Sequence, residues 1–236
     1  TTKTYHIDDA SKAILPLIGP ETIVIPFQNG VDAAERVGAA VGPQHVIGGV
    51  TYLSAAIEAP GVIGQYSQFR RIVIGELDGA ITERIEKAGE TLKGTGAAVE
   101  IVTDISRILW TKFVFISAIS AMGALTRETM GGYRSVPETR AILIEALNEV
   151  VAVAGAKGIS LESDIVKNTM QFIDAATYDM KPSMQRDIEA GRPSELQSMV
   201  GIVVQLGEKL GVSTPVMRIA YAALKPGQEK AISGSH

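Results

Sequence analysis

One lysine stands alone in the longest apolar run of the sequence. Residues 108–126 (ILWTKFVFISAISAMGALT) lie between Arg107 and Arg127 and carry a single charge, Lys112. Burial penalises the ammonium form and lowers the pKa of a lysine, so that a buried lysine can give or take a proton near neutral pH. The alternative is a lysine whose stem lies along a core while its head group reaches water. The length also suits a membrane span, but the lysine and the hydroxyl residues favour a core helix.

Three further polar residues stand where a ligand could be contacted. Asn29 follows an apolar run at residues 22–27 and precedes a helical pattern, which is where open α/β sheets bind their ligands; an Asn-Gly turn is the alternative. Ser183 could present its hydroxyl to a ligand carboxylate or could be an ordinary helix N-cap. Glu195 falls in the first turn of a predicted helix, where the helix dipole favours a carboxylate without any function.

The composition excludes several kinds of chemistry. The chain has 236 residues, no cysteine, three scattered histidines, and 22 Lys and Arg against 26 Asp and Glu. Disulfides, thiolate metal sites and Cys nucleophiles are therefore excluded, and the histidines are too few for a zinc site. A net charge of −4 gives no field that attracts a nucleic-acid backbone or an anionic membrane. We expect no metal, nucleic-acid or membrane partner, and chemistry that runs on Lys, Asp, Glu, Ser, Asn or Tyr side chains or on a cofactor.

The first hundred residues alternate helix and strand patterns. An amphipathic spacing predicts a helix at 7–18, and the β-branched run TIVIPF at 22–27 predicts a strand buried on both faces of a sheet. Strand, glycine turn, helix and strand in succession are typical of an open α/β sheet. Pro60-Gly61 predicts a turn between two strands, which adds antiparallel pairing. The other elements predicted here are helices at 31–41 and 81–94 and strands at 46–56, 62–69, 71–75 and 98–102.

From residue 104 onward the strand signal disappears. Pro137 and Pro215 suit first helical positions, and Ser194 with Gln197 has the spacing of a capping box. The expected fold is therefore α/β plus all-α, with the tail of an α/β domain at residues 1–103 and an all-helical domain at 104–236. The predicted helices are 106–125, 137–156, 163–178, 194–210 and 215–224.

Longer motifs run along essentially the whole chain. They are QNGV at 28–31, GGVTYLSA at 48–55, PGVI at 60–63, WTK at 110–112, PSMQRDIEAGRPSEL at 182–196 and GV-x-TP at 211–215. The set resembles the ketopantoate reductase (2-dehydropantoate 2-reductase) family. This resemblance implies an incomplete Rossmann-type dinucleotide-binding domain followed by a helical substrate and dimerisation domain. It also implies NADPH-dependent reduction of a 2-oxo acid to a 2-hydroxy acid in a cleft between the two.

The resemblance implies a role for each matching residue. Lys112 would be the general acid that protonates the carbonyl oxygen as hydride arrives, and Glu195 the carboxylate that helps position Lys112 or the cofactor ribose. Ser183 would contact the substrate carboxylate, Asn29 would lie near the nicotinamide and the substrate, and Lys3 at the edge of the cofactor site. An ammonium within hydrogen-bond reach both stabilises the charge that hydride delivery builds on oxygen and supplies the proton. Ketopantoate is the leading substrate, which places the reaction in pantothenate and coenzyme A biosynthesis.

Three positions depart from the family pattern. The family often carries Asn four and eight residues after the catalytic Lys; here these are Ile116 and Ser120, of which Ser120 is kept as a candidate substrate contact. An Asn that many members carry three residues before the motif Ser is Met180 here. Loss of amide donors weakens selection for a hydroxylated substrate. A paralogous reductase of a more apolar 2-oxo acid therefore stays open, as does a non-catalytic helical dimerisation or binding module.

The Gly-x-Gly-x-x-Gly loop of the family occurs nowhere in these residues. In the family this loop lies on the first strand and helix, where glycines let the backbone reach the pyrophosphate. The sequence begins with threonines and shows no signal-peptide pattern, so we expect its beginning to be missing and the nucleotide site to be incomplete. Residues 234–236 could be the stub of a purification tag. We also expect NADP as cofactor, a homodimer and a cytoplasmic location.

Overall fold

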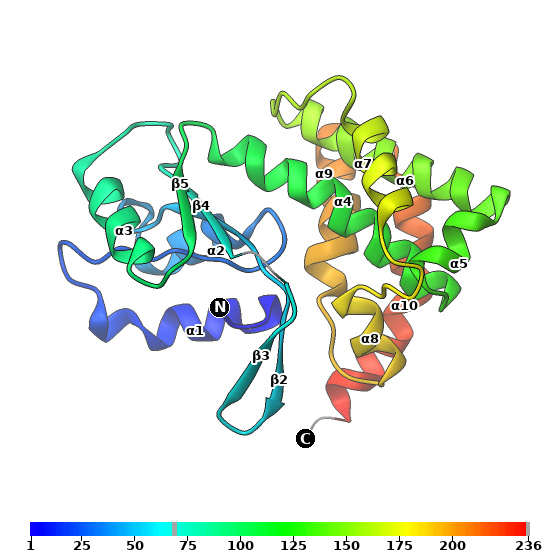
Figure 1. Cartoon of the computed structure of the whole chain (residues 1–236), viewed down its shortest axis with the longest axis horizontal. Helices are drawn as coiled ribbons and strands as arrows, with labels where there is room; N and C mark the ends of the chain where they lie inside the picture. The colour runs from blue at the N-terminus through cyan, green and yellow to red at the C-terminus, as the bar shows by residue number, and fades with distance from the viewer. Residues whose placement is uncertain (68–69, 235–236) are drawn as a thin grey trace. The chain divides into compact units, whose positions relative to one another are not determined.

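The computed structural model describes residues 1–67 and 70–234, which divide into two compact units (Figure 1). Unit 1 covers Thr1–Leu109, and unit 2 begins at Trp110. The division falls inside one long helix, α4 (Ile105–Thr126), whereas the sequence pattern places its boundary just before residue 104. Residues 68–69, at the end of a predicted strand, and 235–236, in the suspected tag stub, lie outside the described residues.

A three-stranded sheet forms the centre of unit 1. Its order is β1-β4-β5, with β4 antiparallel to β1 and parallel to β5 (Figure 1). Successive residues of the middle strand face opposite sides, so Ile74 packs with Ile85 of α3 while Val73 packs with Ile105 at the start of α4. Both faces of the sheet are thus covered, as an α/β layer requires. The elements are β1 (Gly48–Tyr52), β4 (Arg71–Gly75), α3 (Glu83–Lys93) and β5 (Ala98–Ile101).

Two helices at the start of the chain form a second core in unit 1. Ile7 on α1 (Ile7–Ala13) packs with Val37 on α2 (Ala33–Val41). The helix predicted at 7–18 ends early and continues as a 3-10 turn, η2 (Leu15–Leu17), because Pro16 has no N–H to donate to the helix. Two further 3-10 turns are η1 (Thr4–His6) and η3 (Pro43–His45).

The strand predicted at 22–27 is reduced to a single parallel bridge. Val24 pairs with Val46, its N–H donating to the carbonyl of His45 and its carbonyl accepting the N–H of Ile47. Pro26 offers no N–H two residues later, so the ladder cannot continue. The segment still packs where a strand would, since Ile25 and Phe27 contact the cluster that contains Ile47.

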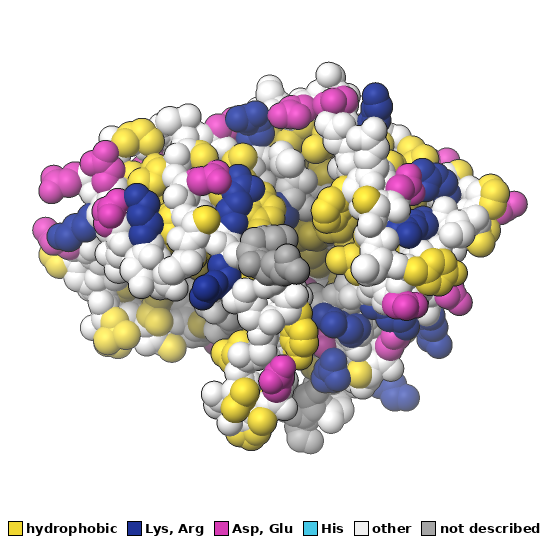
Figure 2. All heavy atoms as spheres, viewed as in Figure 1, with side chains coloured by type: hydrophobic (Ala, Val, Ile, Leu, Met, Phe, Trp, Pro, Cys, Tyr) yellow, Lys and Arg dark blue, Asp and Glu magenta, His cyan; other side chains and the backbone are white. Residues whose placement is uncertain are grey.

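The strand predicted at 46–56 is two strands, and the second belongs to a separate hairpin. β2 (Ala55–Ala59) pairs with β3 (Val62–Gln65) around Gly61, whose φ of 78° fits the predicted turn. Ile57 and Ile63 lie opposite each other and are 79% and 73% exposed, and Figure 2 shows apolar side chains gathered at this hairpin.

Unit 2 is helical, as the sequence predicts. Its long helix α6 (Pro137–Ala156) begins at Pro137 and packs against α7 (Ile165–Ala175), α9 (Ile202–Leu210) and α10 (Pro215–Ser233). Leu143, Leu147 and Val150 on α6 are fully buried in this core. The shorter elements are α5 (Met130–Ser135), which the sequence analysis missed, α8 (Ser183–Glu189) and a π-helical turn, η4 (Gln197–Gly201).

Two predicted helix boundaries in unit 2 are wrong. The helix placed at 194–210 begins at Gln197 with the π-helical turn, and the expected capping box does not form. The Ser194 hydroxyl instead donates to Gln228, and the side-chain oxygen of Gln197 accepts from Tyr221. α10 continues past Pro226 to residue 233, although proline disfavours helix interiors.

The apolar helix α4 is long enough to cross a membrane by length and composition alone. Within its most apolar 18-residue window, 61% of the residues are buried inside the fold. Its Trp110, Phe113, Val114 and Ala118 are at most 2% exposed. This burial is typical of a core helix, which is what the sequence analysis favours for residues 108–126 over a membrane span.

Candidate active site

Lys112 lies on α4, two residues after the helix enters unit 2 at Trp110. Fully buried Phe113 and Val114 follow it directly, and the lysine itself is partly buried. Burial lowers the pKa of Lys112 to about 8, and the negative charge of Glu195 acts in the opposite direction. A lysine with this pKa is still mostly protonated at neutral pH and gives up its proton more readily than an exposed one.

Glu195 is 7% exposed and lies in the segment that connects α8 to the π-helical turn η4. Its backbone carbonyl accepts the N–H of Met199 at 2.9 Å, which ties the residue to η4. The carboxylate acts on Lys112, from which it is separated by more than eighty positions in the chain. Unit 2 thus brings together the two residues that the sequence analysis named as catalytic.

Ser120 and Ser183 lie in different surroundings within unit 2. Ser120 is two turns beyond Lys112 on α4 and is 4% exposed. Ser183 is the first residue of α8 and is exposed; Pro182 holds the N-cap position, so the N-cap interpretation of Ser183 is wrong. Of the two apolar replacements, Ile116 is partly buried on α4 and Met180 is 38% exposed.

Asn29 and Lys3 belong to unit 1. Asn29 lies in the bend before α2 and is partly buried, and Lys3 holds the N-cap position of η1. Gly30, next to Asn29, has a φ of 108°, a conformation that glycine adopts readily and L side chains rarely do. This bend is therefore built by glycine, as the turn interpretation of Asn-Gly requires, and that geometry leaves the ligand-binding interpretation of Asn29 open.

A small pocket lies beside this bend, at the end of the 22–27 segment and the start of α2. Gln28 lines it and was not singled out by the sequence analysis. Its side-chain nitrogen donates to the hydroxyl of Thr2, while its Oε1 is buried with no hydrogen-bond partner among the described residues. The pocket is lined by Pro26, Gln28, Gly30, Val31, Ala33, Ala34, Gly48, Gly49 and Leu109.

The pocket wall depends on a close approach at Gly49. A Cβ built there would lie 2.6 Å from side-chain atoms of both Ile25 and Phe27. Glycine at this position therefore lets the 22–27 segment pack directly onto β1. Gly49 belongs to the GGVTYLSA motif, so the sequence contained this indication of close packing, although the sequence analysis gave the glycines of the motif no role.

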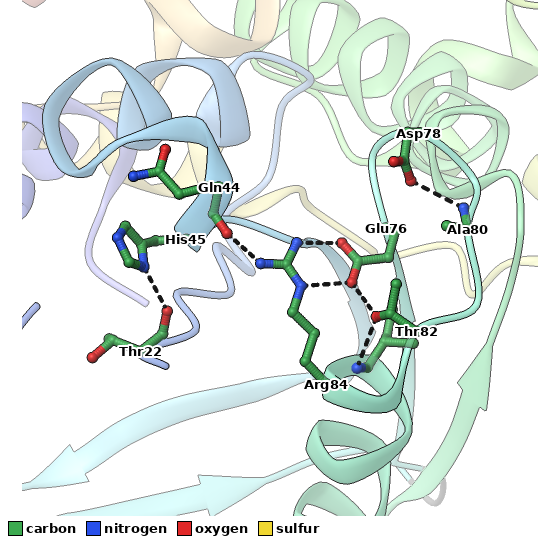
Figure 3. Close-up of polar contacts among 9 residues, drawn as sticks. Thr22, Gln44, His45, Glu76, Asp78, Ala80, Thr82 and Arg84 are labelled. Carbon is green, nitrogen blue, oxygen red and sulfur yellow. Dashed lines mark hydrogen bonds and ion pairs between the residues drawn. The ribbon is translucent and has the colours of Figure 1, made fainter. Parts of the chain in front are cut away.

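An ion pair between buried Glu76 and partly exposed Arg84 fixes the end of β4 in unit 1 (Figure 3). Arg84 donates to both carboxylate oxygens of Glu76 and to the carbonyl of Gln44, and the hydroxyl of Thr82 donates to Glu76 at 2.6 Å. The hydrogen bonds from Arg84 lower the pKa of Glu76. These groups satisfy one another, so the cluster joins β4, α3 and η3 as a structural element. Within residues 1–67 and 70–234, no group of acidic and histidine residues could hold a metal ion.

Curated relatives align with nearly the whole chain. The uncharacterized oxidoreductase YkpB of Bacillus subtilis is 28% identical over 224 residues, which cover 95% of this chain and 74% of the relative. A 2-dehydropantoate 2-reductase of Pyrobaculum aerophilum is 30% identical over 203 residues, covering 84% of this chain and 72% of the relative. The chain therefore spans about three quarters of the length of these relatives.

Solved structures share the fold. The dimeric ketopantoate reductase of Staphylococcus aureus has a TM-score of 0.85 at 21% identity, covering 98% of this chain and 77% of that chain. A complex of D-mandelate dehydrogenase with NADH has a TM-score of 0.88 at 19% identity, again covering 98% and 77%.

The fold and these relatives define the class as an oxidoreductase. Models of the ketopantoate reductase PanE/ApbA family match residues 1–79, and those of its C-terminal region match residues 104–228. The chain belongs to the ketopantoate reductase family, as the sequence motifs predict.

The residues beside the pocket fit part of a nicotinamide dinucleotide. Such a cofactor carries hydroxyl and carboxamide donors and anionic phosphates. The buried Oε1 of Gln28 is an acceptor with no hydrogen-bond donor among the described residues, so it suits a hydroxyl or carboxamide of the cofactor. Gln28 lines the pocket, so unit 1 supplies a group of the right chemistry for one part of the cofactor.

Proposed function

We propose that the protein reduces 2-dehydropantoate (ketopantoate) to pantoate with NADPH, a step of pantothenate and coenzyme A biosynthesis. The observation that supports this most is Lys112, a partly buried lysine on a core helix: burial lowers its pKa to about 8, and a buried carboxylate, Glu195, acts on it. Residues 1–103 would contribute the later part of a dinucleotide-binding domain, and 104–236 a domain for substrate binding and dimerisation. We also propose a cytoplasmic homodimer.

In this mechanism Lys112 holds the proton that the product needs. Its ammonium Nζ donates to the carbonyl oxygen of the 2-oxo acid and stabilises the negative charge that develops there. The cofactor, when bound, supplies the hydride that reduces the carbonyl carbon. Glu195 keeps part of the lysine population protonated, because its charge raises the pKa of Lys112 against the effect of burial.

The remaining candidate residues would bind and orient. Ser183 would donate to the substrate carboxylate from the first turn of α8, and Ser120 would contact the substrate from α4. Asn29 would contact the nicotinamide end of the cofactor and the substrate, and Lys3 would lie at the edge of the cofactor site. Glu195 is also a candidate contact of the cofactor ribose.

A second candidate function is the reduction of a more apolar 2-oxo acid. Ile116 lies one turn beyond Lys112 on α4, where many relatives offer an amide, and Met180 replaces a second amide. A pocket that lacks those donors discriminates less in favour of a hydroxylated substrate. The similarity to D-mandelate dehydrogenase, whose structure was solved with NADH, supports testing both this substrate class and NADH.

The test is the oxidation of NADPH, and separately of NADH, by the full-length protein with ketopantoate, 2-oxoisovalerate and pyruvate. We expect the highest kcat/KM with ketopantoate, and a drop of at least about 10²-fold for Lys112→Ala. Lys167→Ala, at an exposed position on α7, is the matched control and should retain full activity. Preference for 2-oxoisovalerate would favour the second candidate, and turnover of no substrate would favour a non-catalytic binding module.

A further inference from the structure

Gln228, on the last part of α10, holds Ser194 through three hydrogen bonds, two of them to its backbone. The Ser194 N–H and hydroxyl donate to Gln228 Oε1 at 3.0 and 2.6 Å, and Gln228 Nε2 donates to the Ser194 carbonyl at 3.0 Å. Ser194 is 2% exposed, so water cannot easily replace these bonds. One neutral side chain thus satisfies the N–H, the C=O and the hydroxyl of a single buried residue.

Ser194 directly precedes Glu195, and its carbonyl belongs to the peptide group that carries the Glu195 nitrogen. On the other side, the Glu195 carbonyl accepts the N–H of Met199 in η4. The Met199 carbonyl in turn accepts the hydroxyl of Ser117, which lies on the same helix as Lys112 and is fully buried. The backbone around Glu195 is therefore tied to α10 before the residue and to α4 after it.

We propose that Gln228 is a positioning residue, which fixes the backbone at Ser194 so that the Glu195 carboxylate is held where it acts on Lys112. The proposal goes beyond the motif that suggested Glu195, because Gln228 lies more than thirty positions later and the sequence analysis gave it no role. Its relevance to catalysis rests on the proposed function. Its effect on Lys112 is a property of unit 2 alone.

The chemistry of Gln228 suits this task. A glutamine donates and accepts at once, so it can pair with both the N–H and the C=O of one residue. It also carries no charge, so it leaves Glu195 as the charged group that acts on Lys112 among the described residues. The interaction energy between two charges falls with their distance. It falls further when a loosened backbone admits water, because water raises the dielectric constant between them. Removal of the three bonds should therefore weaken the influence of Glu195 on Lys112.

The variant that tests this is Gln228→Met, which keeps the length of the side chain and removes its hydrogen bonds. Gln228→Asn, whose shorter amide cannot span the same bonds, provides a second test if the first variant does not fold. Tyr221→Phe is the matched control, because it removes the hydrogen bond from Tyr221 to Gln197 at 2.6 Å. That bond also joins α10 to η4 but does not involve Ser194 or Glu195.

The first readout needs no cofactor or turnover. Competitive acetylation at a series of pH values, followed by mass spectrometry of the Lys112 peptide, gives the pKa of that lysine directly. We expect Glu195→Gln to lower it, Gln228→Met to lower it by a smaller amount of about 0.5 unit, and Tyr221→Phe to leave it unchanged. Circular dichroism establishes that each variant is folded.

The second readout is the pH profile of kcat/KM. Lys112 must be protonated to act as the acid, so the alkaline limb of the profile reports its pKa. In Gln228→Met this limb should move to lower pH by the same amount as the Lys112 pKa measured by acetylation. An unchanged Lys112 pKa in folded Gln228→Met and Gln228→Asn, or an equal shift in Tyr221→Phe, would overturn the proposal. Retained turnover in Lys112→Ala would instead overturn the catalytic role of the lysine and leave the titration result standing, so the two failures are distinguishable.

Discussion

Replacement of Lys112 by Met is expected to stabilise the folded protein while it removes the proposed proton donor. In an unfolded chain a lysine loses its proton with a pKa of about 10.4, whereas burial in the folded protein lowers the pKa of Lys112 to about 8. At about 1.36 kcal/mol for each pKa unit, the charged lysine costs the folded state about 3 kcal/mol at pH 7. Met keeps most of the apolar stem but leaves buried Glu195 without its cation, so the expected net gain is about 1–3 kcal/mol.

The predicted gain depends on pH. Below pH 8 the lysine is protonated in both the folded and the unfolded chain, and the folded state carries the whole desolvation cost. Between pH 8 and 10.5 the folded chain loses this proton first, so the unaltered protein recovers stability as the pH rises. The difference between Lys112→Met and the unaltered protein should therefore be largest at neutral pH and shrink toward about pH 10.

Urea unfolding followed by circular dichroism at several pH values measures this difference. Lys167→Met, at an exposed position of α7, is the control and should change the free energy of unfolding by less than about 0.5 kcal/mol. The reasoning would be refuted if Lys112→Met were less stable than the unaltered protein at neutral pH. A gain that stayed constant up to pH 10 would refute it as well, because the ammonium would then not be the source of the cost.

Three further substitutions test the packing around the two units by urea unfolding. Glu149→Ala removes the carboxylate that accepts two backbone N–H groups at the start of α10, at 2.8 and 2.9 Å, and should cost about 2–3 kcal/mol, with a smaller loss for Glu149→Gln. Gly49→Ala places a Cβ 2.6 Å from Phe27 and should cost about 1–3 kcal/mol; a neutral effect would show that the 22–27 segment can shift. Arg84→Leu leaves Glu76 buried without its cation and should cost about 1–3 kcal/mol, less than a fully buried pair because the arginine is 38% exposed; an unchanged stability would mean that Thr82 alone satisfies the carboxylate.

The burial of Lys112, the proposed proton donor, could be predicted because its signal is local. A single charge in nineteen apolar and small residues already indicates burial, and burial alone determines the direction of the pKa change. The same apolar run predicted α4 nearly to its ends. Composition and spacing were sufficient here because Lys112 and the apolar residues that make its helix a core element belong to the same segment.

The segment before Glu195 could not be predicted for the opposite reason. Ser194 and Gln197 have the spacing of a capping box, but both side chains bond to residues of α10 instead. Gln228 offers a bond to the hydroxyl, the N–H and the carbonyl of Ser194 together, which a cap does not. A long-range partner that satisfies more groups overrides a local motif. Residues 194–197 alone give no indication that Gln228 is that partner.

The strand predicted at 22–27 does not form because one backbone N–H is missing. Its β-branched residues pack against the sheet as predicted, but Pro26 removes the N–H that a second rung of the ladder needs. Hydrophobic pattern therefore predicted the packing of this segment correctly and its hydrogen bonding wrongly. The pocket beside Gln28 begins where that ladder ends, because backbone that is released from the sheet turns into the bend at Gly30.

The properties of Lys112 follow from two opposing features of unit 2. The apolar sequence of α4 makes the helix a core element and, by the same burial, lowers the pKa of its one lysine; Glu195 acts against that effect from another segment. A deeper burial without the carboxylate would leave a neutral amine at pH 7, which has no proton to give, whereas an exposed lysine would hold its proton too firmly. The balance therefore depends on where Glu195 is held, and the hydrogen bonds that hold its backbone come from Ser117 on α4 through η4 and from Gln228 on α10. Sequence changes at these two supporting positions are expected to shift the pH range of activity without altering any residue that touches the substrate.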